Sequence, residues 1–175
     1  MKLFIFTEGT ILMHKNAAGK TRKEIVKQVK NKEKSVKDYA NYVPIGNATK
    51  KLQKWKNQGI EIIYLTSRAK PTEINAIKTV LKKCKFPNGK LEFRKSRNLL
   101  SKTIFAKNLT HESYANVAER IKPNVLIEDD CESIGGEKEM TITNIKPNIK
   151  KKIKSIVVKE FEGIDELPES FTKLK

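Results

Sequence analysis

Three carboxylates in a row, Glu128, Asp129 and Asp130, are the residues of this chain whose type and spacing point most directly to chemistry. They follow the apolar residues 125–127, which have the character of a short buried strand. Like charges this close repel one another, and a bound cation is the commonest way to make such crowding tolerable. The sequence therefore predicts a cation site at the end of this strand, with an acidic turn in solvent as the alternative.

Two further apolar runs also end in polar residues. Residues 3–6 lead into Thr7-Glu8-Gly9-Thr10, and residues 60–65 lead into Thr66-Ser67-Arg68. Because ligand sites of parallel sheets lie beyond the carboxyl ends of the strands, we expect the three polar clusters to converge at one edge. The second of these clusters could also be an ordinary turn at the entry to a helix.

The elements that must position these clusters alternate along the chain. Such alternation predicts an α/β fold whose mostly parallel sheet is covered by helices on both faces. A length of 175 residues suits one domain, residues 1–175. Strands are predicted at residues 3–6, 60–65, 90–94, 125–127 and 140–145. Helices are predicted at residues 47–58 with Asn47 as N-cap, from Thr72 to about 81, at 110–121 with Thr110 as N-cap, and at 148–155. The last residues are expected to be loosely organised.

Residues 13–43 interrupt this alternation, because they are polar and rich in lysine. Within them Ile25, Val26 and Val29 share one face of a predicted short helix. Pro44 and Gly46 mark the end of the segment. We therefore predict a small excursion between two core elements.

Composition limits the classes of partner. Lysine and arginine number 37 against 20 acidic residues, so the net charge is +17, which favours phosphate-bearing partners, nucleic acid included. Lysines on solvated faces would give the same count. The two cysteines, Cys84 and Cys131, form no CxxC pair, and no apolar run approaches the roughly 18 residues that span a membrane. We expect a soluble cytoplasmic protein without a zinc site, a disulfide framework or a membrane partner.

Taken in order, the polar clusters resemble the motifs of the haloacid dehalogenase-like (HAD-like) superfamily of phosphohydrolases. The resemblance covers Met1 to about Gly136, and it is carried by Gly9-Thr10, by Leu65-Thr66-Ser67-Arg68 and by the three acids after residue 127. It implies a three-layer, Rossmann-type core, Mg²⁺ as cofactor and a phosphorylated small molecule as ligand. It also implies that residues 13–43 form a small cap over the site, a kind of element that closes over substrates.

Carried over residue by residue, the resemblance places Phe6 where the family has its aspartate nucleophile and Glu8 where it has its acid/base. Phenylalanine has no nucleophilic atom, so an aspartyl-phosphate cannot form at this position. Thr7, one residue on, would point to the opposite face of the strand. The first motif is therefore degenerate, and any remaining hydrolysis of phosphoric monoesters would need altered chemistry, with Glu8 as a base or a metal ligand.

The other positions of the family pattern are filled by residues of suitable type. The resemblance implies phosphate binding by Thr66, Ser67, Arg68, Gly9 and Thr10, and metal binding by Asp129 and Asp130, with Glu128 and Glu8 as further ligands. For the cation of the third motif Lys107 is the candidate, with Lys102 as the alternative.

Three functions follow from these expectations. The first is a Mg²⁺-dependent hydrolase with altered chemistry, and the second is a non-catalytic protein that binds a phosphorylated ligand. The third is a basic nucleic-acid-binding or protein-binding module on a HAD-like scaffold. The missing aspartate favours the second over ordinary hydrolysis.

Overall fold

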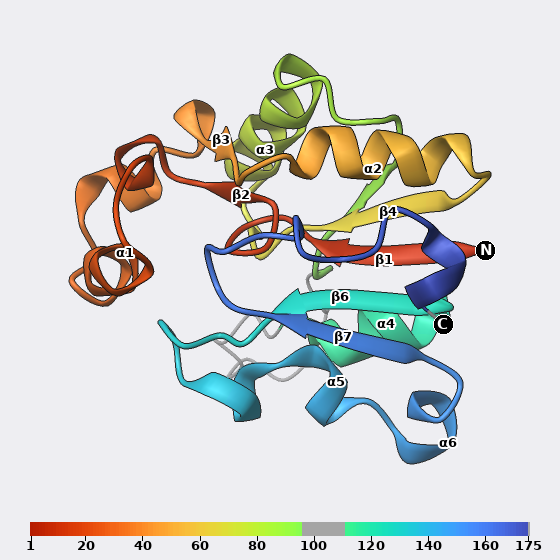
Figure 1. Ribbon diagram of the computed structural model, residues 1–175. Helices are drawn as coiled ribbons and strands as arrows, with labels where there is room; N and C mark the ends of the chain where they lie inside the picture. The colour runs from red at the N-terminus through yellow and green to blue at the C-terminus, as the bar shows by residue number, and fades with distance from the viewer. Residues whose placement is uncertain (96–110, 175) are drawn as a thin grey trace, which may run out of the picture.

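A computed structural model describes residues 1–95 and 111–174. Its centre is a parallel sheet of five strands in the order β5-β4-β1-β6-β7 (Figure 1). Register places Leu3 of β1 beside Ile62 of β4 and Val125 of β6. The strands are β1 (Lys2–Phe6), β4 (Glu61–Leu65), β5 (Lys90–Glu92), β6 (Val125–Asp129) and β7 (Lys154–Val158).

Helices cover both faces of this sheet, because successive strand residues point to opposite sides. Leu3 and Ile5 pack in one core cluster with Trp55, whereas Phe4 packs in the other with Val117. The three-layer α/β prediction is thus confirmed. The helices beside the sheet are α2 (Ala48–Asn57) and α3 (Pro71–Lys83) in the first cluster, and α4 (Tyr114–Ile121), α5 (Thr141–Asn144) and the adjoining α6 (Pro147–Lys150) in or beside the second.

Two predictions for the C-terminal third are wrong. Residues 140–145 form the one-turn helix α5 instead of a strand, because Glu128 accepts the first backbone N–H groups of that turn. The helix expected over 148–155 ends at Lys150, and the fifth strand, β7, begins at Lys154. The last strand of the sheet therefore begins at Lys154 instead of Met140.

The last residues are packed rather than loosely organised. Phe171 is 1% exposed, and its ring lies 5.6 Å from that of Trp55. The Trp55 indole N–H donates to the Pro168 carbonyl at 3.1 Å, and Lys51 donates to the Asp165 carbonyl at 2.9 Å. The chain after β7 therefore covers α2 and closes the first core cluster.

Helix starts differ from the expected caps in detail. Asn47 precedes α2 without a side-chain capping bond, and α3 begins at Pro71 with Lys70 as N-cap instead of Thr72. Ser113 caps α4 through its hydroxyl, while Thr110 lies outside the described residues. The strand predicted at 90–94 ends at Glu92.

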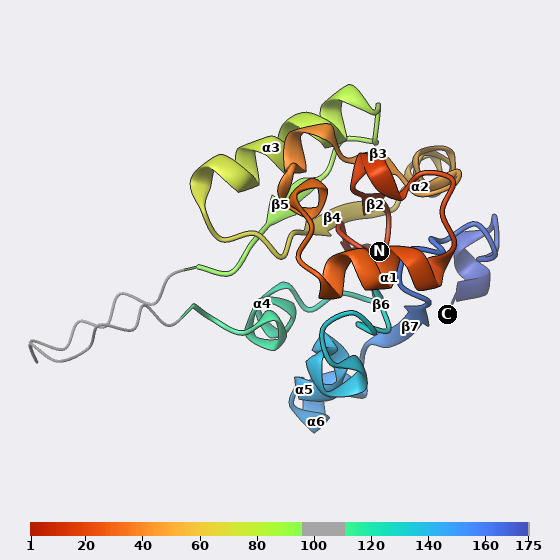
Figure 2. The ribbon, with the colours of Figure 1, turned by 90° about the vertical axis from the view of Figure 1, so that its left-hand side faces the viewer.

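Residues 13–43 leave the sheet through a two-stranded antiparallel stem, β2 (Leu12–Met13) and β3 (Val43–Pro44). Between the strands of this stem lies α1 (Arg22–Lys30), which starts with a capping box and buries Ile25 and Val26. Figures 1 and 2 show α1 in front of the carboxyl ends of the central strands. The segment is thus positioned over the sheet edge where the three polar clusters end.

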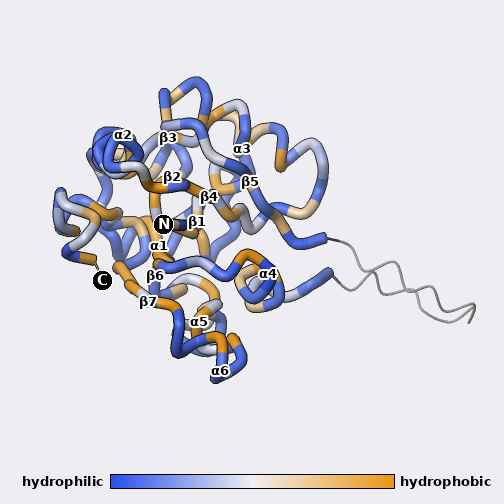
Figure 3. The backbone as a smooth tube through the Cα atoms, turned by 90° about the vertical axis from the view of Figure 1, so that its right-hand side faces the viewer, coloured by the Kyte–Doolittle hydropathy of each residue, from blue (hydrophilic) through white to orange (hydrophobic). Residues whose placement is uncertain are grey.

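Hydrophobic residues concentrate in the central strands, whereas much of the surrounding chain is hydrophilic (Figure 3). Within residues 1–95 and 111–174, no helix has both the length and the apolar character needed to cross a membrane.

Candidate functional site

The carboxyl edge of the sheet borders a cavity of about 300 Å³. Acidic and basic side chains reach it from different strands, and aromatic rings from the core and from residues 13–43 complete its wall. Its charged lining includes Glu8, Glu128, Asp129, Glu160, Arg68 and Arg94, and its aromatic lining includes Phe6, Tyr42, Tyr114 and Phe161. The structure therefore brings part of each of the three polar clusters to one place.

An acid cluster at this edge consists of Asp129, Asp130 and Glu160. One carboxylate oxygen from each lies within 4.8 Å of the others. Asp129 and Glu160 are buried, at 7% and 6% exposure, and Asp130 is half-buried. We call these three residues the acid cluster from here on. Carboxylate oxygens gathered this closely could hold a small cation between them.

Sequence reasoning missed Glu160. It follows β7, whose Val158 pairs with Asp129 of β6, so the end of β7 lies beside the end of β6. The backbone N–H of Glu160 donates to Asp130 at 3.1 Å and fixes this arrangement. An acid at the carboxyl end of a fifth strand is the pattern that could have identified Glu160. The sequence predicts that strand at residues 140–145, so Glu160 is not recognised there as an acid at a strand end.

Neighbouring donors hold the buried carboxylates in position. Asp129 accepts the Thr10 hydroxyl at 2.9 Å and the Cys131 backbone N–H at 3.0 Å. Glu160 accepts the backbone N–H and the hydroxyl of Ser133, at 2.7 and 2.6 Å. Among the described residues, each of these four oxygens has one hydrogen-bond donor, and a carboxylate oxygen has two lone pairs. A free lone pair therefore remains on each oxygen for a metal ion.

Arg22, which sequence reasoning also missed, connects α1 to the acid cluster. Its guanidinium lies 2.6 Å from the Asp130 carboxylate and also pairs with Glu132. Its Nε–H donates to the Glu160 carbonyl at 3.1 Å. The segment of residues 13–43 thus contributes a guanidinium that pairs directly with Asp130.

Burial shapes the electrostatics of the acid cluster. It raises the pKa of Asp129 to about 6, against the lowering effect of the Thr10 and Cys131 hydrogen bonds. Burial also raises the pKa of Glu160, opposed by Ser133. The charged forms are disfavoured, so a divalent cation would offset a cost that the protein otherwise bears. Three carboxylates suit Mg²⁺, which prefers oxygen ligands and usually retains waters.

Glu128 borders the cavity but stands apart from this cluster. Both its oxygens accept backbone N–H groups at the start of α5, from Thr141 at 2.7 Å and Ile142 at 2.9 Å. It is 2% exposed. The structure therefore brings Asp129 and Asp130 together with Glu160, while the Glu128 carboxylate caps a helical turn.

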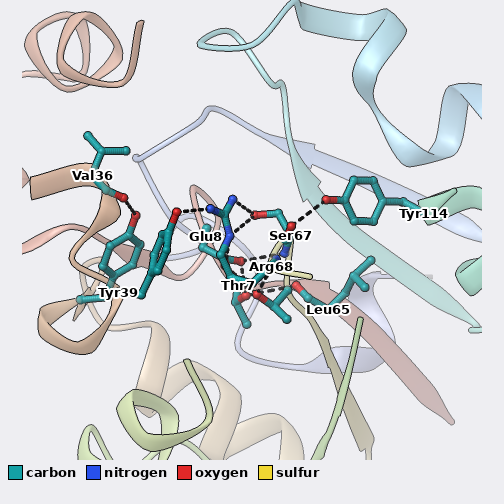
Figure 4. Close-up of polar contacts among 10 residues, drawn as sticks. Thr7, Glu8, Val36, Tyr39, Leu65, Ser67, Arg68 and Tyr114 are labelled. Atoms are coloured by element: carbon teal, nitrogen blue, oxygen red, sulfur yellow. Dashed lines mark hydrogen bonds and ion pairs between the residues drawn. The ribbon is translucent and has the colours of Figure 1, made fainter. Parts of the chain in front are cut away.

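Glu8 contacts the residues expected to bind phosphate (Figure 4). Its carboxylate accepts the Thr66 hydroxyl at 2.6 Å and the Ser67 backbone N–H at 3.2 Å. The Thr7 hydroxyl donates to it at 2.5 Å, and the Arg68 Nε lies 3.3 Å away. The structure thus brings Glu8 to the anion-binding candidates and places it outside the acid cluster.

Arg68 is held by several partners as well. Its Nε and one terminal nitrogen donate to the Ser67 hydroxyl, at 3.1 and 2.5 Å. Another terminal nitrogen donates to the Tyr39 hydroxyl, and the guanidinium lies 4.6 Å from the centre of that ring (Figure 4). Residues 13–43 thus hold this side chain in place beside the cavity.

Phe6 forms part of the cavity wall. Its ring packs edge-on against Tyr114, with 5.3 Å between ring centres. Thr7 is fully buried and is not part of the cavity lining, and its one hydroxyl hydrogen is shared between the Glu8 carboxylate at 2.5 Å and the Leu65 carbonyl at 3.1 Å. Neither residue therefore offers a free nucleophilic atom to the cavity.

Gly9 and Thr10 support the acid cluster. Gly9 has φ +81°, and a Cβ at this position would lie 2.7 Å from an oxygen of Asp129. Only glycine permits this close approach in that conformation. Thr10 is fully buried and donates to the same carboxylate oxygen. Lys102 and Lys107, the candidates for the third motif, lie outside the described residues.

No family model matches the chain, and no curated protein matches it either. Among solved structures, it is similar to the D,D-heptose 1,7-bisphosphate phosphatase from Burkholderia thailandensis, at 8% identity and a TM-score of 0.44, over 92% of this chain and 93% of the other. It is also similar to the corresponding phosphatase from B. bronchiseptica, complexed with magnesium and phosphate, at 9% identity and a TM-score of 0.46, over 93% of this chain and 94% of the other. A third similar structure is a phosphoserine phosphatase in its apo form, at 14% identity and a TM-score of 0.44, over 92% of this chain and 94% of the other.

Proposed function

We propose that this chain is a divergent HAD-like protein that binds Mg²⁺ and a phosphorylated small molecule in the cavity without hydrolysing it through an aspartyl-phosphate. The observation that carries the proposal is the pairing of opposite charges in one cavity. Asp129 and Glu160 of the acid cluster line it together with Arg68. A metal ion beside the acids would compensate their negative charge. A phosphoryl group between that ion and the guanidinium would compensate the positive charge of both.

In this proposal the acid cluster holds the metal ion. Asp129 and Glu160 would bind it through the lone pairs that Thr10, Cys131 and Ser133 leave free. Asp130, also paired with Arg22, would complete the set. A bound Mg²⁺ supplies positive charge to the oxygens of the phosphoryl group.

The absence of ordinary hydrolysis follows from two side chains. Phe6 lacks the carboxylate that attacks phosphorus in the HAD-like superfamily, which the sequence resembles, and its ring is packed against Tyr114. Glu8 is the remaining acid of the first motif, and each of its oxygens has two donors: Thr66 and Arg68 contact Oε1, and Thr7 and Ser67 contact Oε2. It is therefore a poor general base for activating water, because a base must reach a proton of its target.

We further propose that residues 13–43 act as the small cap of this site. Arg22 and Tyr39, both from this segment, contact Asp130 and Arg68 respectively. The cap thereby contacts both the metal side and the phosphate side of the cavity. It would exclude water and select the part of the ligand that projects from the phosphate.

Mg²⁺ is expected to raise the melting temperature of the protein, since a ligand that binds only the native state stabilises it. At a concentration about 100 times the dissociation constant the gain is about 2.7 kcal/mol. For a chain of this size that corresponds to roughly 5–10 °C. A thermal melt with and without about 10 mM Mg²⁺ measures the shift.

Glu160→Gln should largely remove this shift, because it neutralises one ligand while the amide can still bond to Ser133. Glu119→Gln is the matched control, since Glu119 is outside the cavity lining and pairs with Lys146. An unchanged wild-type melt at millimolar Mg²⁺ would contradict the metal site. Equal shifts in both variants would exclude the acid cluster as its location.

Phosphomonoesters are expected to be bound but not turned over. With Mg²⁺ and a panel of phosphomonoesters, release of phosphate should not exceed that of a Glu8→Gln variant. The reason is that no described residue of the first motif presents an unpaired nucleophile or base to the cavity. Mg²⁺-dependent turnover that disappears in this variant would instead establish the hydrolase with altered chemistry.

A further inference from the structure

The contacts of Glu8 are those of a bound anion. Its carboxylate receives a side-chain hydroxyl from Thr66, a backbone N–H from Ser67 and the guanidinium of Arg68, within 2.6 to 3.3 Å. Hydroxyl, backbone amide and guanidinium groups at the end of a strand are also the donors that recognise phosphoryl oxygens. The anion at their centre is a side chain of the protein itself.

We infer that the Glu8 carboxylate is a built-in competitor of the phosphoryl group for Thr66, Ser67 and Arg68. This inference rests on the proposed function, because it concerns the phosphate half of the same site. A phosphoryl group reaches these donors only when Glu8 leaves them. Glu8 therefore sets the affinity and the selectivity of the cavity for phosphorylated ligands.

Two features of the contact set support competition over shared occupancy. First, the donors are few and already used: the Thr66 hydroxyl has one hydrogen, and so has the Ser67 backbone N–H. Both are directed at Glu8. Second, a phosphoryl group placed on the same donors would be a second anion beside a carboxylate that is 12% exposed, and like charges in such a setting repel strongly.

A third feature separates this role from metal binding. The described residues whose carboxylate oxygens gather within 4.8 Å are Asp129, Asp130 and Glu160, and Glu8 is not among them. The negative charge of Glu8 is already paired with the guanidinium of Arg68. Neutralising Glu8 should therefore leave Mg²⁺ binding intact, whereas a Glu8 that ligates the metal would lose Mg²⁺ binding with its charge.

The test compares phosphate binding by the wild type, Glu8→Gln and Glu119→Gln. The amide of Glu8→Gln retains an oxygen that can accept from Thr66 or Ser67, so the fold is preserved while the charge is removed. Glu119→Gln changes the net charge equally, and Glu119 is also 12% exposed with one ion pair. Inorganic phosphate is titrated calorimetrically in the presence of Mg²⁺, with sodium chloride of equal ionic strength as reference.

Glu8→Gln is expected to bind phosphate at least about tenfold more tightly than the wild type, because the competing charge is gone. Glu119→Gln should bind as the wild type does. Thr66→Val added to Glu8→Gln should remove the gain, since it deletes the hydroxyl that the phosphate would inherit. Glu8→Ala removes the carboxylate altogether and leaves the donors of Thr66, Ser67 and Arg68 without this partner. It should show the same gain in phosphate affinity, which would exclude an effect of the glutamine side chain itself.

Unchanged or weaker phosphate binding in both Glu8 variants would overturn the inference, even if their Mg²⁺-dependent melting shift is normal. Loss of the Mg²⁺ shift in Glu8→Gln would also overturn it, since Glu8 would then be a metal ligand. Failure of the proposed function has a different signature, because no variant and no wild-type sample would then respond to Mg²⁺ at all.

Discussion

Asp129→Asn is expected to make the metal-free protein more stable at neutral pH and to abolish its stabilisation by Mg²⁺. Burial raises the pKa of this carboxyl from its ordinary value near 3.8 to about 6, so its ionised form is costly in the folded state. A shift of this size corresponds to roughly 3 kcal/mol at most. The amide keeps one acceptor oxygen for the Cys131 N–H and would have to donate to the Thr10 hydroxyl, which reduces the net gain to about 1–2 kcal/mol.

The pH dependence of this gain has a defined sign. The folded-state pKa of Asp129 lies above its unfolded value, so the folded protein holds the proton more tightly. The wild type loses stability as the pH rises from about 4 to about 6, and this loss is complete above that range. The stability difference between variant and wild type should therefore be smallest near pH 4, grow up to about pH 6 and stay constant above.

Urea unfolding with a chelator present, at a series of pH values, measures this difference. Asp165→Asn is the matched control, because its carboxylate accepts the Asn47 backbone N–H well outside the cavity lining. It should cost stability and leave the Mg²⁺ shift unchanged. A loss of stability in Asp129→Asn that does not vary with pH would contradict the buried-charge account.

The parts of the fold that sequence reasoning predicted are those governed by burial. Residues 3–6, 60–65 and 125–127 are apolar runs, and they became the three central strands β1, β4 and β6. A buried strand has to be apolar on both faces, so its composition alone identifies it. The convergence of the polar clusters at one edge follows from that, because parallel strands place their ends together.

The parts that were missed depend on contacts between distant segments. The edge strand β7 contains the β-branched residues Ile156, Val157 and Val158, but it begins at Lys154, directly after a run of lysines that extends the helical pattern predicted before it. The turn of α5 is fixed by the Glu128 carboxylate, which reaches it from β6. A local pattern does not contain such information, and the error at β7 concealed Glu160.

The hydrogen-bond partners of Glu8 could not be predicted from the sequence either. The family resemblance implies that Glu8 is a base or a metal ligand. In the structure its oxygens face Thr66 and Ser67. The choice depends on which way one side chain turns at the end of β1, which periodicity does not fix.

Glu128→Ala is expected to destabilise the protein strongly and to leave the Mg²⁺ shift intact. The substitution leaves the backbone N–H groups of Thr141 and Ile142 without their acceptor in a buried setting. Each such loss costs about 1–3 kcal/mol, so the total is about 2–5 kcal/mol. The melting temperature should fall by roughly 5–15 °C.

Burial raises the pKa of Glu128 as well, so Glu128→Gln regains part of the cost of a buried charge. It should still destabilise, because both oxygens of Glu128 accept backbone N–H groups and one end of the amide would bring a donor against a backbone donor. The ion-binding alternative makes the opposite prediction: Glu128→Gln would then be nearly as stable as the wild type without metal, and would lose the response to Mg²⁺. Melts of both variants with and without Mg²⁺ separate the two accounts.

Asp129 and Glu128 together give the sharpest test of the site, since they are adjacent residues of one strand whose side chains leave opposite faces. We expect Asp129→Asn to gain stability without metal and lose the Mg²⁺ response, and Glu128→Gln to lose stability and keep that response. A general effect of removing negative charge from a protein of net charge +17 would move both variants in the same direction. Loss of the Mg²⁺ response in Asp129→Asn and its retention in Glu128→Gln would locate the metal ion on the Asp129 face of the strand.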